Sequence, residues 1–259
     1  MQSTISIENH LEKLYALWLR EFKVFLRERS RLVASIFTPV LWLFVIGSGL
    51  GSAIPSTVPG FDYQQFIFPG IIAMSIIFTS VFYGSYIIWD RKFDFLKSVM
   101  VAPVSRTTVF VGKTLGGMTN SLIQASILLS IGVAIGIPFT PLSLAQAVAV
   151  VLLMSFGLTS LGLALGSYMY SLEGFQMIVS FVVFPLFFLS GALFPLDNLP
   201  PWLSVLTSAD PVAYGVDAMR NLMLGTGTHP VEFDLAILAT YTAALGAFGV
   251  FSFGRMKAV

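Results

Sequence analysis

The sequence contains no cysteine and only two histidines in 259 residues, and only 10% of its residues are charged. Without cysteine, disulfides and thiolate metal sites are excluded. A soluble domain carries about 25% charged residues, whereas this chain is 56% hydrophobic and has a mean hydropathy of +0.86. The composition therefore predicts an integral membrane protein with membrane lipids around it, and the net charge of +1 gives no indication of a nucleic-acid partner.

Ionisable residues are also missing from the centre of every long apolar run. Ion-coupled carriers usually place such groups there, so a secondary carrier has no obvious coupling site. His10 and His229 both lie outside the apolar runs. The apolar runs therefore contain no histidine for a metal site or for a histidine-dependent membrane enzyme. We therefore expect no catalytic residue, no metal and no cofactor on this chain.

One short motif resembles part of a nucleotide-binding loop. Gly112-Lys113-Thr114 matches the end of the phosphate-binding pattern, but Thr107 stands where the first glycine is required. The strand that should precede such a loop is also missing. We therefore do not expect this chain to bind ATP.

Apolar stretches long enough to cross a membrane alternate with clusters of Lys and Arg. Two prolines in Pro138-Phe139-Thr140-Pro141 divide the longest stretch in two. With six spans, thirteen of the fourteen Lys and Arg residues fall on one side, which the positive-inside rule assigns to the cytoplasm together with both termini. The predicted fold is an all-α integral membrane protein with spans at 33–53, 66–89, 113–137, 143–170, 175–194 and 235–254.

An amphipathic helix is predicted before the first span, over residues 9–28. Trp18, Phe22 and Phe25 lie on one face at helical spacing, and Glu21 falls on the opposite, charged face. Such a helix is expected along the cytoplasmic membrane surface. It is either an anchor that fixes the topology or a lever that passes force from a cytoplasmic partner into the first span.

A second amphipathic segment follows the second span and is stopped by Pro103. Its apolar positions, such as Phe95 and Val99, make it too hydrophobic for a solvated loop. It either folds back onto the bilayer or inserts into a partner protein.

On the external side, residues 197–224 contain apolar runs that are too short to span. We predict two short re-entrant helices, Pro201–Ser208 and Pro211–Leu224, because irregular backbone at membrane depth survives only where protein buries it. Asp217 and Arg220 are three positions apart and are expected to pair with each other, in preference to binding a substrate.

Polar and small residues inside the spans are interpreted mainly as helix contacts. Asn120 and Gln124 lie one turn apart and are expected to form interhelical hydrogen bonds, with a polar patch on a transport route as the alternative. Four pairs of glycines four residues apart are expected at close helix contacts, either within or between subunits. These pairs are Gly47/Gly51, Gly112/Gly116, Gly132/Gly136 and Gly162/Gly166.

Several segments in this order resemble a known family. Phe66-Ile-Phe-Pro-Gly70, Ala102-Pro-Val-Ser-Arg106 and the run from Leu189 to Pro201 are similar to the membrane subunit of type-2 ATP-binding-cassette exporters. The resemblance covers roughly residues 10–255. Within the family, the sequence resembles the branch that includes permeases for anthracycline resistance and for nodulation lipo-oligosaccharide export.

The resemblance implies a homodimer of this chain with two separate ATPase subunits, which would hold ATP and Mg²⁺. Residues 9–28 would be a connecting helix, with Trp18, Phe22 and Phe25, and residues 91–103 a coupling helix that docks on the ATPase. The implied contact residues are Arg91, Phe93, Phe95, Leu96, Val99, Met100, Pro103 and Arg106.

The resemblance also places the solute route along the interface between the two permeases, mainly between the second and fifth spans. Asp217 and Arg220 would belong to an external gate. Candidate route residues are Ser75, Phe78, Thr79 and Phe82 on the second span, Asn120 and Gln124 on the third, and Val179, Val182 and Val183 on the fifth.

The function predicted is export of an amphipathic solute, which could be a drug, a lipid or a lipid-linked glycan, out of the cytoplasm or the inner leaflet. The chain itself would not be an enzyme, would work by alternating access and would lie in a bacterial inner membrane. A secondary carrier remains the first alternative, and a lipid-acting membrane enzyme using Asp197, Asp210, Asp217 and His229 the second.

Overall fold

The computed structural model describes residues 2–51, 61–101, 104–196 and 199–256, without the side chains of residues 2–10, 31, 50 and 100. The regular structure within these ranges consists of eleven α-helices. The helices are α1 (Gln2–Arg27), α2 (Arg29–Gly51), α3 (Tyr63–Phe82), α4 (Ser85–Lys92), α5 (Phe95–Val101), α6 (Arg106–Ala134), α7 (Pro141–Tyr168), α8 (Leu172–Leu189), α9 (Pro201–Ser208), α10 (Pro211–Leu224) and α11 (Val231–Arg255).

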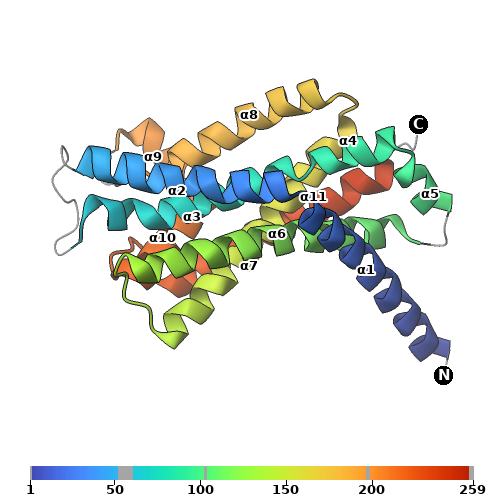
Figure 1. Cartoon of the computed structure of the whole chain (residues 1–259), viewed down its shortest axis with the longest axis horizontal. Helices are drawn as coiled ribbons and strands as arrows, with labels where there is room; N and C mark the ends of the chain where they lie inside the picture. The colour runs from blue at the N-terminus through green and yellow to red at the C-terminus, as the bar shows by residue number, and fades with distance from the viewer. Residues whose placement is uncertain (1, 52–60, 102–103, 197–198, 257–259) are drawn as a thin grey trace.

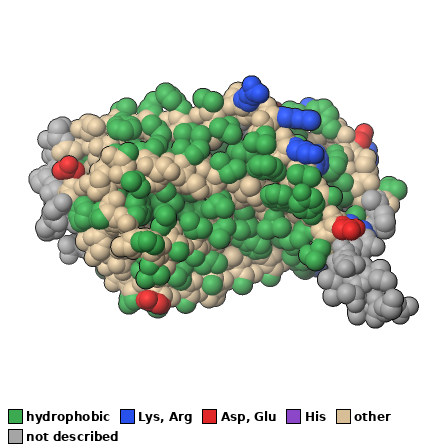
Figure 2. Space-filling view, turned by 60° about the horizontal axis from the view of Figure 1, so that its bottom comes forward, with side chains coloured by type: hydrophobic (Ala, Val, Ile, Leu, Met, Phe, Trp, Pro, Cys, Tyr) green, Lys and Arg blue, Asp and Glu red, His purple; other side chains and the backbone are tan. Residues whose placement is uncertain are grey.

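Within the described residues, six stretches of helix are long and apolar enough to cross a membrane. They are formed by α2, by α3 together with α4, and by α6, α7, α8 and α11. Hydrophobic side chains cover the middle of the surface in Figure 2, and the Lys and Arg side chains visible on that face lie toward one end. The predicted six-span, all-α membrane fold is confirmed.

The two ends of the bundle carry different elements (Figure 1). Helix α1, helix α5 and the last turns of α11 lie at one end, which we call the basic end. Helices α9 and α10 lie at the other, which we call the hairpin end. The boundaries of α9 and α10 are those expected from the sequence, since each helix begins at a proline in its first turn.

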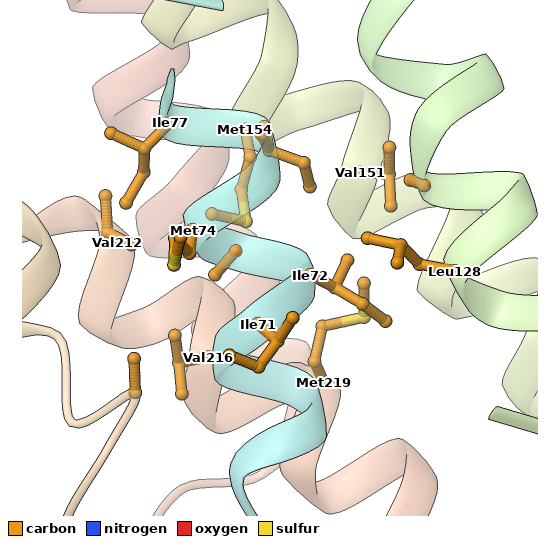
Figure 3. Close-up of a cluster of buried hydrophobic side chains, with 14 of the residues drawn as sticks. Ile71, Ile72, Met74, Ile77, Leu128, Val151, Met154, Val212, Val216 and Met219 are labelled. Carbon is orange, nitrogen blue, oxygen red and sulfur yellow. The ribbon is translucent and has the colours of Figure 1, made fainter. Parts of the chain in front are cut away.

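The core is built around α3, which is buried along almost its whole length. Its side chains pack against α6, α7 and α10, and Figure 3 shows Ile72 near Leu128 and Val151, with Val212 and Val216 on another side of the helix. Because helices on several sides enclose α3, its apolar residues need no amphipathic periodicity.

The second span is not one continuous helix. It is interrupted at Tyr83–Gly84, between α3 and α4, where α7 approaches so closely that a Cβ atom on Gly84 would meet the backbone of Gly162. A Cβ atom on Gly166 would likewise meet the carbonyl of Gly84. The predicted close contact at Gly162/Gly166 is therefore confirmed, and it lies within one subunit.

Other boundaries differ from the expected ones. The coupling segment expected at 91–103 is divided, because Asp94 adopts a φ of 56° between α4 and α5. A left-handed residue cannot continue an α-helix, so the short helix begins only at Phe95. Helix α1 begins earlier than expected, at Gln2, while Pro103 and residues 52–53 lie outside the described residues.

Candidate functional site

Four charged side chains meet at the basic end, between α1, α4 and α6; three of them are buried, and Arg20 is half-buried. The Nζ atom of Lys113 on α6 lies 3.0 Å from Oε1 of Glu21 on α1 and also contacts the carboxylate of Asp90 on α4. Arg20 joins the same two acids, with nitrogen–oxygen distances of 2.6 Å to Glu21 and 2.8 Å to Asp90. We call Arg20, Glu21, Asp90 and Lys113 the buried charge cluster.

Glu21 is therefore not on a solvated face, and the sequence expectation for it was wrong. Burial by itself raises the pKa of the Glu21 carboxyl, but Lys113, the Tyr83 hydroxyl 2.6 Å away and Arg20 outweigh burial and hold this pKa below its usual range. The side chain is accommodated because Gly116 on α6 leaves room for it. The sequence signal that could have indicated this contact is Lys113, which lies between Gly112 and Gly116. A charged residue between two closely spaced glycines is consistent with a close, charged helix contact.

The cluster also contacts α5, since the guanidinium carbon of Arg20 lies 3.4 Å from the centroid of the Phe95 ring. Such stacking of a cation on an aromatic face is favourable. Elsewhere on α1, Trp18 donates a hydrogen bond of 2.9 Å from Nε1 to Thr119 on α6 and stacks on Phe22, and Phe25 is buried. The aromatic face of α1 thus packs on the protein itself.

The residues of the segment expected to contact an ATPase differ in their exposure to solvent. Phe93 and Val101 are 70% and 88% exposed, and Phe95 and Val99 are half-buried. Leu96, by contrast, is 1% exposed and packs in an apolar cluster with Ile87 and Phe253. Leu96 is therefore directed into the core of the protein and is not available as a docking residue in this structure.

Two arginines from the same expected set hold backbone carbonyls of this chain. Arg91 is buried on α4 and donates hydrogen bonds of 2.6 Å to the carbonyl of Met169 and 3.0 Å to that of Ser167, at the end of α7. Arg106 is exposed and donates to the carbonyls of Gly254 and Met256, at the end of α11. Arg91 is thus a positioning residue for α7, and the side chain of Met100 is outside the described residues.

Five of the nine expected route residues are buried inside the bundle. Ser75 is buried on α3, and Val179 and Val183 are buried on the inner face of α8. Gln124 accepts a hydrogen bond from Thr79 on α3 and donates one to the carbonyl of Ser35 on α2, which confirms the expected interhelical contact. Asn120 is buried as well, whereas Val182 is half-buried.

Aromatic side chains form the outer edge between α3 and α8. The rings of Phe78 and Phe82 stack with centroids 6.0 Å apart, and Phe78 meets the edge of Phe184 at 5.9 Å. Phe181, Phe184 and Phe188 are exposed on α8. We call Phe78, Phe82, Phe181, Phe184 and Phe188 the aromatic edge; the α8 members were missed because helical period alone does not fix which face is inward.

At the hairpin end, a cavity of about 500 Å³ opens among α3, α9 and α10. Its lining includes Asp217, Arg220 and His229. Asp217 accepts hydrogen bonds of 2.8 and 2.9 Å from the backbone N–H groups of Thr228 and His229. Arg220 donates one of 2.8 Å to the carbonyl of Gly191 and lies over the ring of Phe66. Asp217 and Arg220 thus each hold a neighbouring segment, and their expected pairing with each other stays a prediction.

Six apolar spans, amphipathic helices gathered at one end and charges confined to the ends of the spans define a multi-pass membrane protein. A family model described as "ABC-2 type transporter" matches residues 12–224, which is most of the chain. This protein therefore belongs to the ABC-2 type transporter family. The family resemblance inferred from the sequence motifs is confirmed, and the chain is a membrane transport permease.

Two relatives illustrate the match. The chain is 29% identical over 236 residues to the inner membrane transport permease YadH of Escherichia coli strain K12, covering 89% of this chain and 90% of YadH. It is 28% identical over 246 residues to Nodulation protein J of Neorhizobium galegae, covering 92% of each chain. The similarity therefore extends over nearly the whole length of both proteins.

Proposed function

We propose that this chain is the membrane subunit of an ATP-driven exporter in a bacterial inner membrane. Two copies would combine with two separate ATPase subunits, which would carry ATP and Mg²⁺. The family membership and the name of the inner membrane permease YadH support this proposal. The basic end would face the cytoplasm, in agreement with the positive-inside rule.

The buried charge cluster is the observation that carries the proposal. A partner that contacts the exposed side chains of Phe93 and Val101 would move α5, and α5 contacts Arg20 through Phe95. Arg20 and Glu21 lie next to each other on α1 and are bound to Asp90 on α4 and Lys113 on α6. Because ion pairs buried this deeply are costly to break, a displacement of α1 or α5 would carry the two spans with it.

The solute would move along the aromatic edge, where α3 and α8 meet the second copy of the chain. These exposed aromatic rings would suit an amphipathic solute such as a drug, a lipid or a lipid-linked glycan. Alternating access would follow from two arrangements of the permease dimer, which the ATPase subunits would bind differently. Helices α9 and α10, with Asp217 and Arg220, would form the external gate.

The test is to purify the chain from its native membrane, to identify and quantify what copurifies, and to measure ATPase activity. The variants Phe93→Asp and Val101→Asp place a charge on the exposed docking surface. Leu142→Asp is the matched control, since Leu142 is 69% exposed in the first turn of α7. Leu96 is unsuitable because a charge there would disrupt the core. We expect a nucleotide-binding subunit in equal amount, lost with the first two variants and retained with Leu142→Asp.

A chain that is purified alone, with no ATPase activity and no effect of the two charged variants, would contradict the proposal. The secondary carrier would then be favoured. The lipid-acting enzyme would be favoured only if activity on lipids were lost on substituting Asp210, Asp217 or His229.

A further inference from the structure

Three side chains of the types that bind metals come together at the hairpin end. The sequence alone does not show that they are neighbours. Asp217 belongs to α10, His229 to the turn after it, and Asp234 to the first turn of α11. One ligand atom from each residue lies within 4.8 Å of the other two. From the sequence, His229 was not expected to take part in a metal site. That expectation did not consider the turn between α10 and α11.

The buried carboxylate of Asp234 is the second, independent observation. Asp234 is 0% exposed, and neither of its carboxylate oxygens has a hydrogen-bond partner among the described residues. Its Oδ1 atom faces the cluster, 3.7 Å from Nδ1 of His229. A buried carboxylate without hydrogen bonds is unfavourable. A cation between the three residues would supply what the carboxylate lacks.

The two distances from the histidine nitrogen to the carboxylates are close to those around a tetrahedral ion. Zinc bonds to nitrogen and oxygen of about 2.1 Å place neighbouring ligand atoms about 3.4 Å apart. Nδ1 of His229 lies 3.2 Å from Oδ2 of Asp217 and 3.7 Å from Oδ1 of Asp234, on either side of that value. The two carboxylates would balance the charge of a divalent ion, with the imidazole neutral.

The surroundings orient the ligands from outside, as in established metal sites. The backbone N–H groups of Thr228 and His229 donate to Asp217, so the turn is held over α10. Asn221 donates to the carbonyl of His229, and the ring of His229 stacks on Phe233 with centroids 5.1 Å apart. Gly225, with a φ of 69°, ends α10 in the left-handed conformation that lets the chain turn back.

The cavity at the hairpin end gives an ion a way in, because Asp217 and His229 line it. We propose that Asp217, His229 and Asp234 bind a divalent transition-metal ion such as Zn²⁺. Three protein ligands leave a fourth position for water or another ligand. The bound ion joins α10 to α11 across the turn and stabilises the hairpin end.

The composition of the chain makes this site easy to test with Zn²⁺ itself. The sequence has no cysteine, and His10 is the only other histidine, so few competing sites exist. The full-length protein is purified in detergent with an affinity tag that contains no histidine. Zinc binding is measured by competition with a chromogenic chelator, and the bound metal is counted by mass spectrometry after dialysis.

We expect one Zn²⁺ per chain in the unmodified protein and in the His10→Ala variant. In Asp234→Asn and His229→Gln the affinity falls by more than about tenfold, because each loses one ligand of three. Glu232→Gln is the matched control: its carboxylate lies two residues from Asp234 in the same turn but is exposed, and binding is unchanged. Co²⁺ in place of Zn²⁺ gives the strong visible absorption of a tetrahedral site in the protein and not in His229→Gln.

Circular dichroism and thermal unfolding establish that each variant is folded, and added Zn²⁺ raises the melting temperature only where the site is intact. The proposal is overturned if the unmodified protein binds no zinc. It is equally overturned if His229→Gln, which alters a half-exposed side chain, binds zinc as tightly as the unmodified protein. Loss of binding in His10→Ala alone would assign the ion to His10.

Discussion

The ammonium of Lys113 on α6 lies 3.0 Å from the carboxylate of Glu21 on α1, and both side chains are almost completely buried. This pair connects a helix before the first span to the third span of the bundle. Buried charges require partners on every side, and Asp90, Arg20 and the Tyr83 hydroxyl provide them. The amphipathic helix is thus bound to the spans through charges, and not only through its aromatic face.

Replacing Lys113 by Met should therefore destabilise the protein strongly. The substitution leaves Glu21 and Asp90 buried next to each other with Arg20 as the remaining cation of the cluster, and breaking a buried pair in this way costs about 3–5 kcal/mol. Lys97→Met is the control, since Lys97 and its partner Asp94 are exposed, and an exposed pair contributes about 1 kcal/mol or less. Unfolding in detergent, followed by circular dichroism, measures both; equal effects would show that the buried charges contribute little.

The contact between α7 and the break in the second span leads to a second prediction. Gly162→Ala should destabilise the protein by about 1–3 kcal/mol, because the new Cβ atom would meet backbone atoms of Val81, which cannot rotate away. Gly254→Ala, where no atom lies within 4 Å of the added Cβ, should instead be neutral or stabilising by up to about 1 kcal/mol. The same unfolding measurement compares them, and similar effects of the two substitutions would contradict the close approach.

The fold could be predicted well from the sequence, because long apolar runs and clustered Lys and Arg carry most of the information in a membrane protein. Even the two short helices α9 and α10 were expected at the observed residues, since prolines mark where each begins. Two features that depend on a single backbone position were not predicted. These are the break at Tyr83–Gly84 and the left-handed Asp94, which divides the expected coupling helix.

The candidate sites could be predicted only in part, because helical periodicity does not say which face is inward. Glu21 was expected in solvent, and it is buried because Gly116 admits it. Val179 and Val183 were expected on the solute route, yet the exposed face of α8 carries Phe181 and Phe184. Asp234 was not noticed at all, since its meeting with Asp217 requires the turn between α10 and α11.

Asp210 leads to a prediction about pH. Burial raises the pKa of its carboxyl from 3.8 to about 7, although the N–H of Val212 donates to it. The folded protein therefore holds this proton to a higher pH than the unfolded chain, so the contribution of Asp210 to stability is complete below about pH 4 and is lost as the pH rises through 7. The difference between the two pKa values corresponds to at most about 4 kcal/mol.

Asp210→Asn should remove this pH dependence. Asparagine also accepts a hydrogen bond at the start of a helix, so the cap of α10 is retained. We expect the variant to match the unmodified protein near pH 4 and to be more stable at pH 8, as measured by thermal unfolding across that range. Asp62→Asn, at the exposed start of α3, is the control and should leave the pH dependence unchanged. A variant that is less stable than the unmodified protein at pH 8 would contradict the prediction.

The proposed dimer contact can be tested by cross-linking, because the chain has no cysteine of its own. Phe181 is 77% exposed on α8, and Phe184 lies on the same face and touches Phe78 of the second span. If two copies meet along the aromatic edge, Phe181→Cys and Phe184→Cys should each give a disulfide-linked dimer on mild oxidation of native membranes. Phe251→Cys, on the exposed face of α11, is the matched control and should stay monomeric. Cross-linking through Phe251→Cys and not through α8 would move the interface, and with it the proposed solute route, to α11.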